Sequence, residues 1–291
     1  MAVYKRTYHA YHGPVSSRRW RFLVVSRYCV SALFQSRIFI ASLAFCLLPF
    51  VIFVGLIYVI NSPVAQAALQ IHGAAPFAID AAFFMKFLQS MGWLGLFLCA
   101  YGTPGLVSMD LANNALPLYL SRPLSRAEYV LGKAAVVLGM LSVVTWIPGV
   151  LLYLVQAAMA GNGWGWNNLP ILGAIMAGSL LWISFLALVA LAISAYVRWK
   201  VIAIASIVAF MFVPAAFGAA LGAILRTRWG LLLNIPYLNS LIWSHLFGVL
   251  TPFERMGTVP LTTAWMVFLF ISAGALFVLH ERIRAREVVR G

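Results

Sequence analysis

The chain alternates between long apolar stretches and short polar segments that carry most of its charges. A membrane core about 30 Å thick is crossed by a helix of about 20 apolar residues, because a helix satisfies its own backbone hydrogen bonds in lipid. Six stretches are long enough, and we therefore predict an all-α polytopic membrane protein with six transmembrane helices. The predicted helices cover residues 38–60, 83–107, 129–156, 169–197, 201–225 and 259–279.

The basic residues orient these helices in the membrane. Of the 20 Lys and Arg residues, sixteen lie on one side: seven before the first helix, three after the second, two after the fourth and four in the C-terminal tail. The other side carries Arg226, Arg228 and Arg255, with Lys86 at the edge of a helix. Cytoplasmic loops are enriched in Lys and Arg, so both termini are predicted to be cytoplasmic.

Residues 226–258 contain a further apolar run, 235–250, which is interrupted at its start by Asn234 and Pro236. The run is shorter than a spanning helix, and a seventh span would move the arginine-rich tail to the outside. We therefore expect residues 226–258 to form a re-entrant segment on the external side, before the last helix.

Residues 15–37 mix five arginines with aromatic and aliphatic residues just before the first predicted span. This mixture suits an amphipathic interfacial helix, with its aromatics at the headgroup boundary and its cations near anionic lipid. We expect this helix to follow a flexible N-terminus, residues 1–14, and to precede a six-helix transmembrane domain over residues 38–291. Membrane lipids are thus among the predicted partners.

The composition is that of a protein whose solvent is lipid, because 64% of its residues are hydrophobic and only 9% are charged. A net charge of +14 can indicate a nucleic-acid partner, but here the basic residues lie in short clusters between apolar runs. The three cysteines and five histidines are scattered without metal-ligand spacing. We predict no nucleic-acid partner and no metal site.

The apolar runs offer little chemistry. No Asp, Glu, Lys, Arg or His lies near the middle of a predicted helix, and Lys86 and Lys133 lie at helix ends, where long side chains can reach the interface. Protease and esterase motifs are absent, and Gly132-Lys133 lacks both the first glycine and the Ser or Thr of a phosphate-binding loop. The chain is therefore predicted to have no catalytic residue and no cofactor site of its own.

The segment between the second and third predicted helices, residues 108–128, is the most informative part of the chain. Ser108 or Asp110 can cap a short helix, which a later proline would end. Ser125 and Glu128 then have the spacing of a capping box that opens the third span. A short helix, a stiff turn and a capped membrane helix can transmit a push from a cytoplasmic partner. The alternative interpretation is an ordinary, well-capped loop.

This segment resembles the loop after the second span in ABC transporter permeases of the type-two (ABC-2) exporter family. That loop carries an acidic residue, a stretch ending in Leu-Ser-Arg-Pro-Leu-Ser-Arg, then Glu-Tyr and Gly-Lys. Here these elements are Asp110, residues 119–126, Glu128-Tyr129 and Gly132-Lys133. The layout from residue 15 to the C terminus is similar too: an interfacial helix, six spans, a very short third cytoplasmic connection and an external re-entrant segment.

The resemblance implies a permease subunit in the cytoplasmic (inner) membrane of a prokaryote, which pairs with a second permease copy or a paralogue and exports a substrate. Two cytoplasmic ABC ATP-binding subunits would hydrolyse ATP, with ATP and Mg bound to them and not to this chain. Residues 108–117 would be a coupling helix docked on the ATPase, and residues 198–200 a second contact. The residues implied in this coupling are Asp110, Asn113, Asn114, Arg122, Arg126, Glu128, Arg198 and Lys200.

In the fifth predicted helix, Gly218 and Gly222 have the G-x-x-x-G spacing and follow an expected kink at Pro214. Small residues at this spacing let a second helix approach closely in lipid. We predict a helix interface at these glycines, either the seam between two permeases or packing within the chain.

Two other classes of function stay open on the sequence alone. One is a non-transporting membrane module that recruits or regulates partners. The other is an ion-coupled secondary carrier, which the lack of charges within the spans and the lack of an internal repeat disfavour. The spans contain no convergent charged pocket, and their aromatic and small apolar residues favour a lipid-linked or amphipathic cargo over a small ion.

Overall fold

The computed structural model of the chain describes residues 21–69, 78–112, 126–250 and 259–284. These residues are mostly helical, contain no strand, and include six helical segments long and apolar enough to cross a membrane. The all-α class with six candidate spans is therefore confirmed. The helices are α1 Arg21–Phe34, α2 Arg37–Cys46, α3 Leu48–Asn61, α4 Pro63–Ala68, α5 Ala81–Ala112, α7 Arg126–Val144, α8 Trp146–Ala160, α9 Trp164–Asn167, α10 Leu169–Tyr196, α11 Lys200–Leu225, η2 Trp229–Leu233, α12 Ile235–Phe247 and α14 Leu261–Arg284.

The six candidate spans follow the six predicted apolar runs. Each run overlaps one span, and the first and third spans are each built from two consecutive helices, α2 with α3 and α7 with α8. The spans cover Arg37–Asn61, Ala81–Ser108, Ala127–Ala160, Leu169–Tyr196, Lys200–Leu225 and Leu261–Arg282.

Prolines explain the two breaks. The ring of a proline clashes with the carbonyl group four residues earlier and cannot donate a backbone hydrogen bond. Pro49 follows the break at Leu47, and Pro148 follows the break at Thr145. Pro104 and Pro214, in contrast, lie inside α5 and α11, which continue through them.

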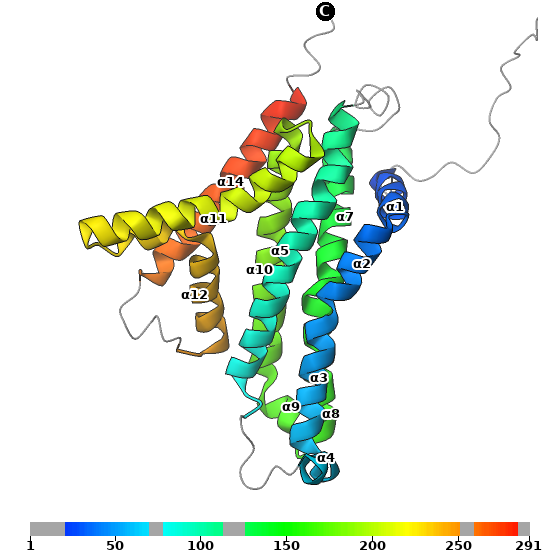
Figure 1. Ribbon diagram of the computed structural model, residues 1–291, viewed down its shortest axis with the longest axis vertical. Helices are drawn as coiled ribbons and strands as arrows, with labels where there is room; N and C mark the ends of the chain where they lie inside the picture. The colour runs from blue at the N-terminus through cyan, green and yellow to red at the C-terminus, as the bar shows by residue number, and fades with distance from the viewer. Residues whose placement is uncertain (1–20, 70–77, 113–125, 251–258, 285–291) are drawn as a thin grey trace, which may run out of the picture.

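The long helices form a bundle with two distinct ends (Figure 1). Helices α5, α7, α8 and α10 run along the long axis, and α5 and α10 contact each other extensively. One end of the bundle, here called the upper end, holds the C-terminal ends of α5 and α10 and the N-terminal ends of α7 and α11. The opposite, lower end holds α4 and α9.

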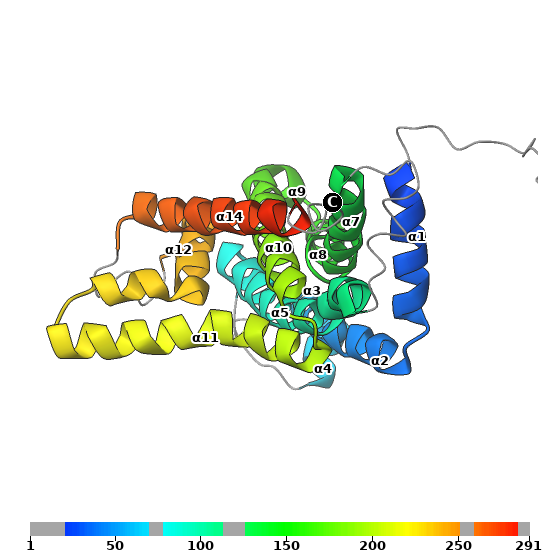
Figure 2. The same cartoon turned by 90° about the horizontal axis from the view of Figure 1, so that it is seen from above.

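Helix α1 lies across the bundle near its upper end. It is seen end-on in Figure 1 and lengthwise in Figure 2, so its axis is roughly perpendicular to the long axis of the molecule. The interfacial helix predicted over residues 15–37 ends earlier in the structure, because α1 stops at Phe34. Ser36 then caps the next helix, α2, by accepting a hydrogen bond from the backbone N–H of Phe39. Residues 1–20 lie outside the described residues.

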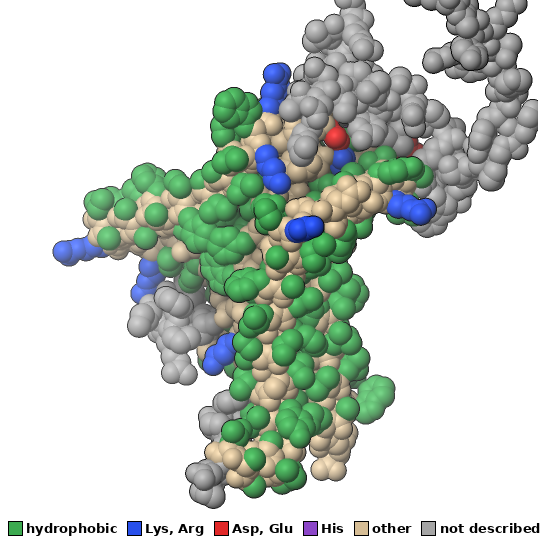
Figure 3. All heavy atoms as spheres, turned by 45° about the vertical axis from the view of Figure 1, so that its right-hand side comes forward, with side chains coloured by type: hydrophobic (Ala, Val, Ile, Leu, Met, Phe, Trp, Pro, Cys, Tyr) green, Lys and Arg blue, Asp and Glu red, His purple; other side chains and the backbone are tan. Residues whose placement is uncertain are grey.

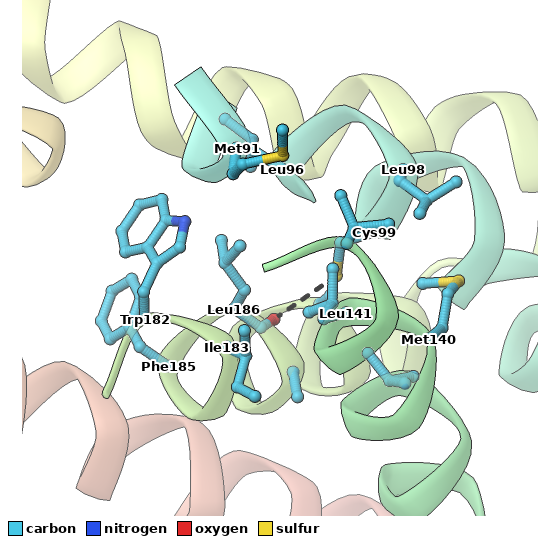
Figure 4. Close-up of a cluster of buried hydrophobic side chains, with 14 of the residues drawn as sticks. Met91, Leu96, Leu98, Cys99, Met140, Leu141, Trp182, Ile183, Phe185 and Leu186 are labelled. Atoms are coloured by element: carbon cyan, nitrogen blue, oxygen red, sulfur yellow. Dashed lines mark hydrogen bonds between the residues drawn. The ribbon is translucent and has the colours of Figure 1, made fainter. Parts of the chain in front are cut away.

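The core lies where α5, α7 and α10 meet (Figure 4). Leu98, Leu141 and Leu186 are almost fully buried there, and the Cys99 thiol donates to the carbonyl group of Leu186. In the second and fourth spans 61% and 67% of the most apolar window is buried, against 11%, 22% and 17% in the first, fifth and sixth. The apolar surfaces of those three spans are thus available to lipid or to another chain.

Helix α11 leaves the upper end obliquely and runs away from the bundle (Figure 1), with η2 packed against it. The apolar run predicted over residues 235–250 forms α12, which contacts α10, α5 and α14. With 13 residues α12 is about 20 Å long, too short to cross a membrane. Residues 251–258 lie outside the described residues.

Candidate functional site

A buried ion pair joins the last turn of α5 to the first turns of α7. Asp110 Oδ2 lies 2.8 Å from Lys133 Nζ, and the two side chains are only 18% and 3% exposed. The Tyr129 hydroxyl donates to the same carboxylate oxygen over 2.9 Å. Buried charges need partners, because leaving either one alone in a low-dielectric site is costly. Each of the two charges is therefore stabilised in its buried position by the other.

The lysine also ties this pair to the crosswise helix α1. Its ammonium group carries three donors, and besides Asp110 it reaches the carbonyl oxygen of Leu106 at 2.7 Å and the sulfur of Cys29 at 3.2 Å. Cys29 belongs to α1. On the same helix, the Ser26 hydroxyl donates to the carbonyl oxygen of Gly132 over 2.8 Å. The upper cluster, defined as Ser26, Cys29, Asp110, Tyr129 and Lys133, thus locks α1, α5 and α7 together.

Lys133 does not behave as its position in the sequence suggests. We expected its stem to reach the membrane interface, but the side chain is 3% exposed and points into the protein. The expectation was wrong because Asp110 on the neighbouring helix α5 pairs with the Lys133 ammonium group inside the protein. Lys86, expected to behave in the same way, is exposed.

The segment expected to begin a separate coupling helix continues α5 instead. Residues 108–112 are its last turns, and the Ser108 hydroxyl donates to the carbonyl oxygen of Ser194 in α10 over 3.1 Å. Ser108 and Asp110 therefore cap no helix there, because nothing between Pro104 and Ala112 stops α5. Residues 113–117, the rest of the predicted helix, lie outside the described residues.

The remaining predicted coupling residues fall into two groups. Asn113, Asn114, Arg122 and Ser125 lie outside the described residues, as does the side chain of Arg126. Helix α7 begins at Arg126 and carries Glu128 in its first turn, where a carboxylate is favourable. The described residues thus include the acidic half of the predicted capping box, and Asp110 is brought to the same helix junction.

The second predicted contact, residues 198–200, turns the chain at the upper end. Arg198 is exposed in the turn between α10 and α11, while the Lys200 ammonium lies 4.4 Å from the centre of the Tyr101 ring on α5. Nearby, the Arg282 guanidinium of α14 lies 4.8 Å from the ring centre of Tyr196. Figure 3 shows basic side chains around this end of the molecule. Cation–π contacts hold Lys200 and Arg282 in place, whereas the side chain of Arg198 is exposed.

The two glycines of the fifth span pack within the chain. A Cβ atom on Gly218 would clash with the carbonyl oxygen of Gly230 in η2, and one on Gly222 would lie 3.2 Å from that of Thr227. Of the two interfaces predicted for these glycines, the structure therefore contains the one within the chain. The close approach requires glycine on both sides, because Gly230 is equally tight against Gly218.

Sequence reasoning included Asp110 but missed Lys133, Tyr129, Ser26 and Cys29 as contact residues. One signal was present: opposite charges, Asp110 and Lys133, flank one connection between two antiparallel spans. Within the described residues, no group of three or more His, Cys, Asp or Glu could hold a metal ion.

No protein-family model matches the chain, and no curated protein matches it either.

Proposed function

We propose that the chain is the transmembrane permease subunit of an ATP-driven ABC transporter, an exporter of the ABC-2 type that works with separate cytoplasmic ATP-binding subunits. The observation that carries the proposal is the upper cluster. Three residues of the resembling motif, Asp110, Tyr129 and Lys133, meet at the junction of the two helices that the motif connects.

The cluster suits a segment that must pass on force. Asp110 lies where the chain leaves α5, and Tyr129 and Lys133 lie just after it enters α7. A push on residues 113–125 would therefore move α5 and α7 together instead of being absorbed at either end. Packed and hydrogen-bonded groups of this kind can carry energetic coupling between distant sites. Through Ser26 and Cys29 the displacement would also reach α1.

The same proposal places the upper end in the cytoplasm of a prokaryotic cell. The excess of Lys and Arg on this side supports that orientation. The crosswise course of α1 suits a helix lying along the membrane surface, where its arginines would meet anionic headgroups. Arg198 and Trp199, both exposed at this end, would form the second contact with the ATPase. A second copy or a paralogue would complete the transporter.

The test is to purify the tagged chain from its native membrane in mild detergent, identify the proteins that co-purify, and measure ATP hydrolysis by the complex. We expect a stoichiometric ATP-binding subunit. Arg122→Ala, in the proposed docking segment, and Asp110→Ala, at its base, should lower association or hydrolysis by about fivefold or more.

Lys86→Gln is the matched control, because Lys86 is exposed near the opposite end of α5 and touches no part of the upper cluster. Its complex should hydrolyse ATP at the wild-type rate. A wild-type chain that emerges without any ATPase, under conditions that preserve other membrane complexes, would contradict the proposal and favour the non-transporting membrane module.

A further inference from the structure

A cavity of about 710 Å³ lies between helix α11 and helices α5, α10 and α12. Its walls come from α5, α10, α11, η2 and α12, so it is built within one chain. The volume is in the range of pockets that hold small organic ligands. The cavity shares no residue with the upper cluster.

The floor of the cavity is a rigid pair of tryptophans. The indole N–H of Trp182 donates to the carbonyl oxygen of Gly92 over 3.1 Å, and that of Trp243 donates to the carbonyl oxygen of Gly178 over 3.0 Å. A Cβ on Gly92 would lie 2.8 Å from the Trp243 ring, so glycine is needed for this packing. Because both N–H groups are used, the two tryptophans offer the cavity apolar ring surface held in a fixed position.

Polar groups on one face of α12 complement this apolar floor. Asn239 lines the cavity and is 5% exposed, yet its Oδ1 has no hydrogen-bond partner among the described residues. The next residue of α12 is Ser240, whose Oγ accepts a hydrogen bond from Gln89 Nε2 over 3.0 Å. The hydroxyl proton of Ser240 can therefore still be donated to a ligand. A buried amide oxygen without a partner is unfavourable. The oxygen itself is covered in this structure, so a ligand hydroxyl in the cavity would satisfy it once the Asn239 amide turns toward the cavity.

The mouth of the cavity combines a cation with aromatic surface. Arg228 lines the cavity and is exposed, and its guanidinium suits bidentate binding of a phosphate. Trp93 and Phe212 stack with ring centres 5.7 Å apart and planes within 15°, and they are 40% and 41% exposed. Such exposed, stacked rings between two candidate spans offer a surface for an aliphatic chain.

We infer that this cavity binds an anionic lipid whose headgroup carries hydroxyl groups. Arg228 would hold the phosphate, Asn239 and Ser240 would meet the hydroxyls, and the Trp93–Phe212 pair would contact the acyl chain. The inference names a substrate class for the proposed transporter, and the role of the lipid as a substrate therefore rests on the proposed function. The binding site itself depends only on the cavity.

The experiment measures lipid binding to the purified full-length chain by native mass spectrometry, with phosphatidylglycerol and phosphatidylcholine of identical acyl chains as probes. Phosphatidylglycerol should bind more tightly. Arg228→Gln should weaken its binding about tenfold, because a charged hydrogen bond is lost. Asn239→Ala should weaken phosphatidylglycerol and leave phosphatidylcholine unchanged.

Arg226→Gln is the matched control, since Arg226 is also exposed, lies two residues away and does not line the cavity. It should bind phosphatidylglycerol as the wild type does. Equal losses in the Arg226 and Arg228 variants would mean that lipid binds only through general surface charge, and would overturn the inference. So would a folded Arg228→Gln chain that binds with wild-type affinity.

A water-soluble arm separates lipid from headgroup alone. Glycerol 3-phosphate should bind at least tenfold more weakly than the lipid, because it leaves the Trp93–Phe212 surface uncovered. Equal affinity would overturn the role of the acyl chain. No ATPase is needed in these measurements, so a failure to bind lipid leaves the coupling proposal standing, and a missing ATPase leaves the lipid site standing.

Discussion

The ammonium group of Lys133 shows how one residue can determine local structure in a membrane protein. Its three acceptors come from two helices besides its own, and Tyr129 on its own helix shares the Asp110 carboxylate. Replacing a buried ion pair by apolar groups is often nearly neutral, whereas removing one partner strands the other charge. The consequence of a substitution here depends on which member of the pair is left.

We predict that Lys133→Met lowers the free energy of unfolding by about 3 kcal/mol, because Asp110 loses its countercharge while it stays mostly buried. Thermal unfolding in detergent, followed by tryptophan fluorescence, measures the effect. The double variant Asp110→Asn/Lys133→Met should be more stable than the single one, since no unpaired charge remains. Lys86→Met, at an exposed lysine, should change stability by less than about 0.5 kcal/mol. A single variant as stable as the wild type would show that the pair contributes nothing.

At the scale of elements, the contact between α11 and η2 depends on backbone meeting backbone. Gly218 and Gly230 face each other so closely that neither has room for a methyl group. The oblique helix α11 has few buried residues of its own, and this contact ties its far end to η2 and, through η2, to α12. Both η2 and α12 line the cavity that we propose to bind lipid.

Gly218→Ala should therefore loosen η2 from α11. Trypsin cleaves after arginine, and the exposed Arg226 and Arg228 lie between the two elements. We expect cleavage there to become about fivefold faster, as local opening becomes easier by about 1 kcal/mol. Gly173→Ala is the control, because a Cβ at Gly173 meets nothing within 4 Å. Equal cleavage rates in the two variants would contradict the packing described for Gly218.

How far the sequence predicts these elements depends on the range of the interactions involved. Long apolar runs locate all six candidate spans, because hydropathy is a local property. Hydropathy does not predict the breaks at Leu47 and Thr145. Proline does not predict them either, because a proline follows the end of α2 but another proline lies inside α5, which continues through it. The upper cluster was only partly predictable. Pairing of Asp110 with Lys133 requires knowing that α5 continues past Ser108, which depends on its contact with α10.

At the scale of the whole molecule, hydrophobic side chains cover much of the surface in Figure 3. Basic side chains lie around the upper end, and others lie on the oblique arm and lower on the body. The first, fifth and sixth spans bury few of their residues in the single chain. Such surfaces are normal for a protein surrounded by lipid, and they leave area for a second permease.

We predict that the upper end faces the cytoplasm and the lower end faces outward. Asn167→Cys, exposed on α9, should react with a membrane-impermeant thiol reagent on intact cells, and Arg198→Cys only after permeabilisation. The native cysteines Cys29, Cys46 and Cys99 are buried, so background labelling should be low. The reverse pattern would invert the orientation, and labelling of both variants on intact cells would contradict a membrane-spanning arrangement.

The ion pair of the upper cluster also has an evolutionary consequence. Because either charge alone is unfavourable once buried, positions 110 and 133 form a unit on which selection acts jointly. In homologues that diverge from this chain, loss of the aspartate should be accompanied by loss of the lysine, with an uncharged pair in their place. Tyr129 can be replaced by phenylalanine earlier along such a path, since its hydroxyl shares an oxygen that the lysine already satisfies.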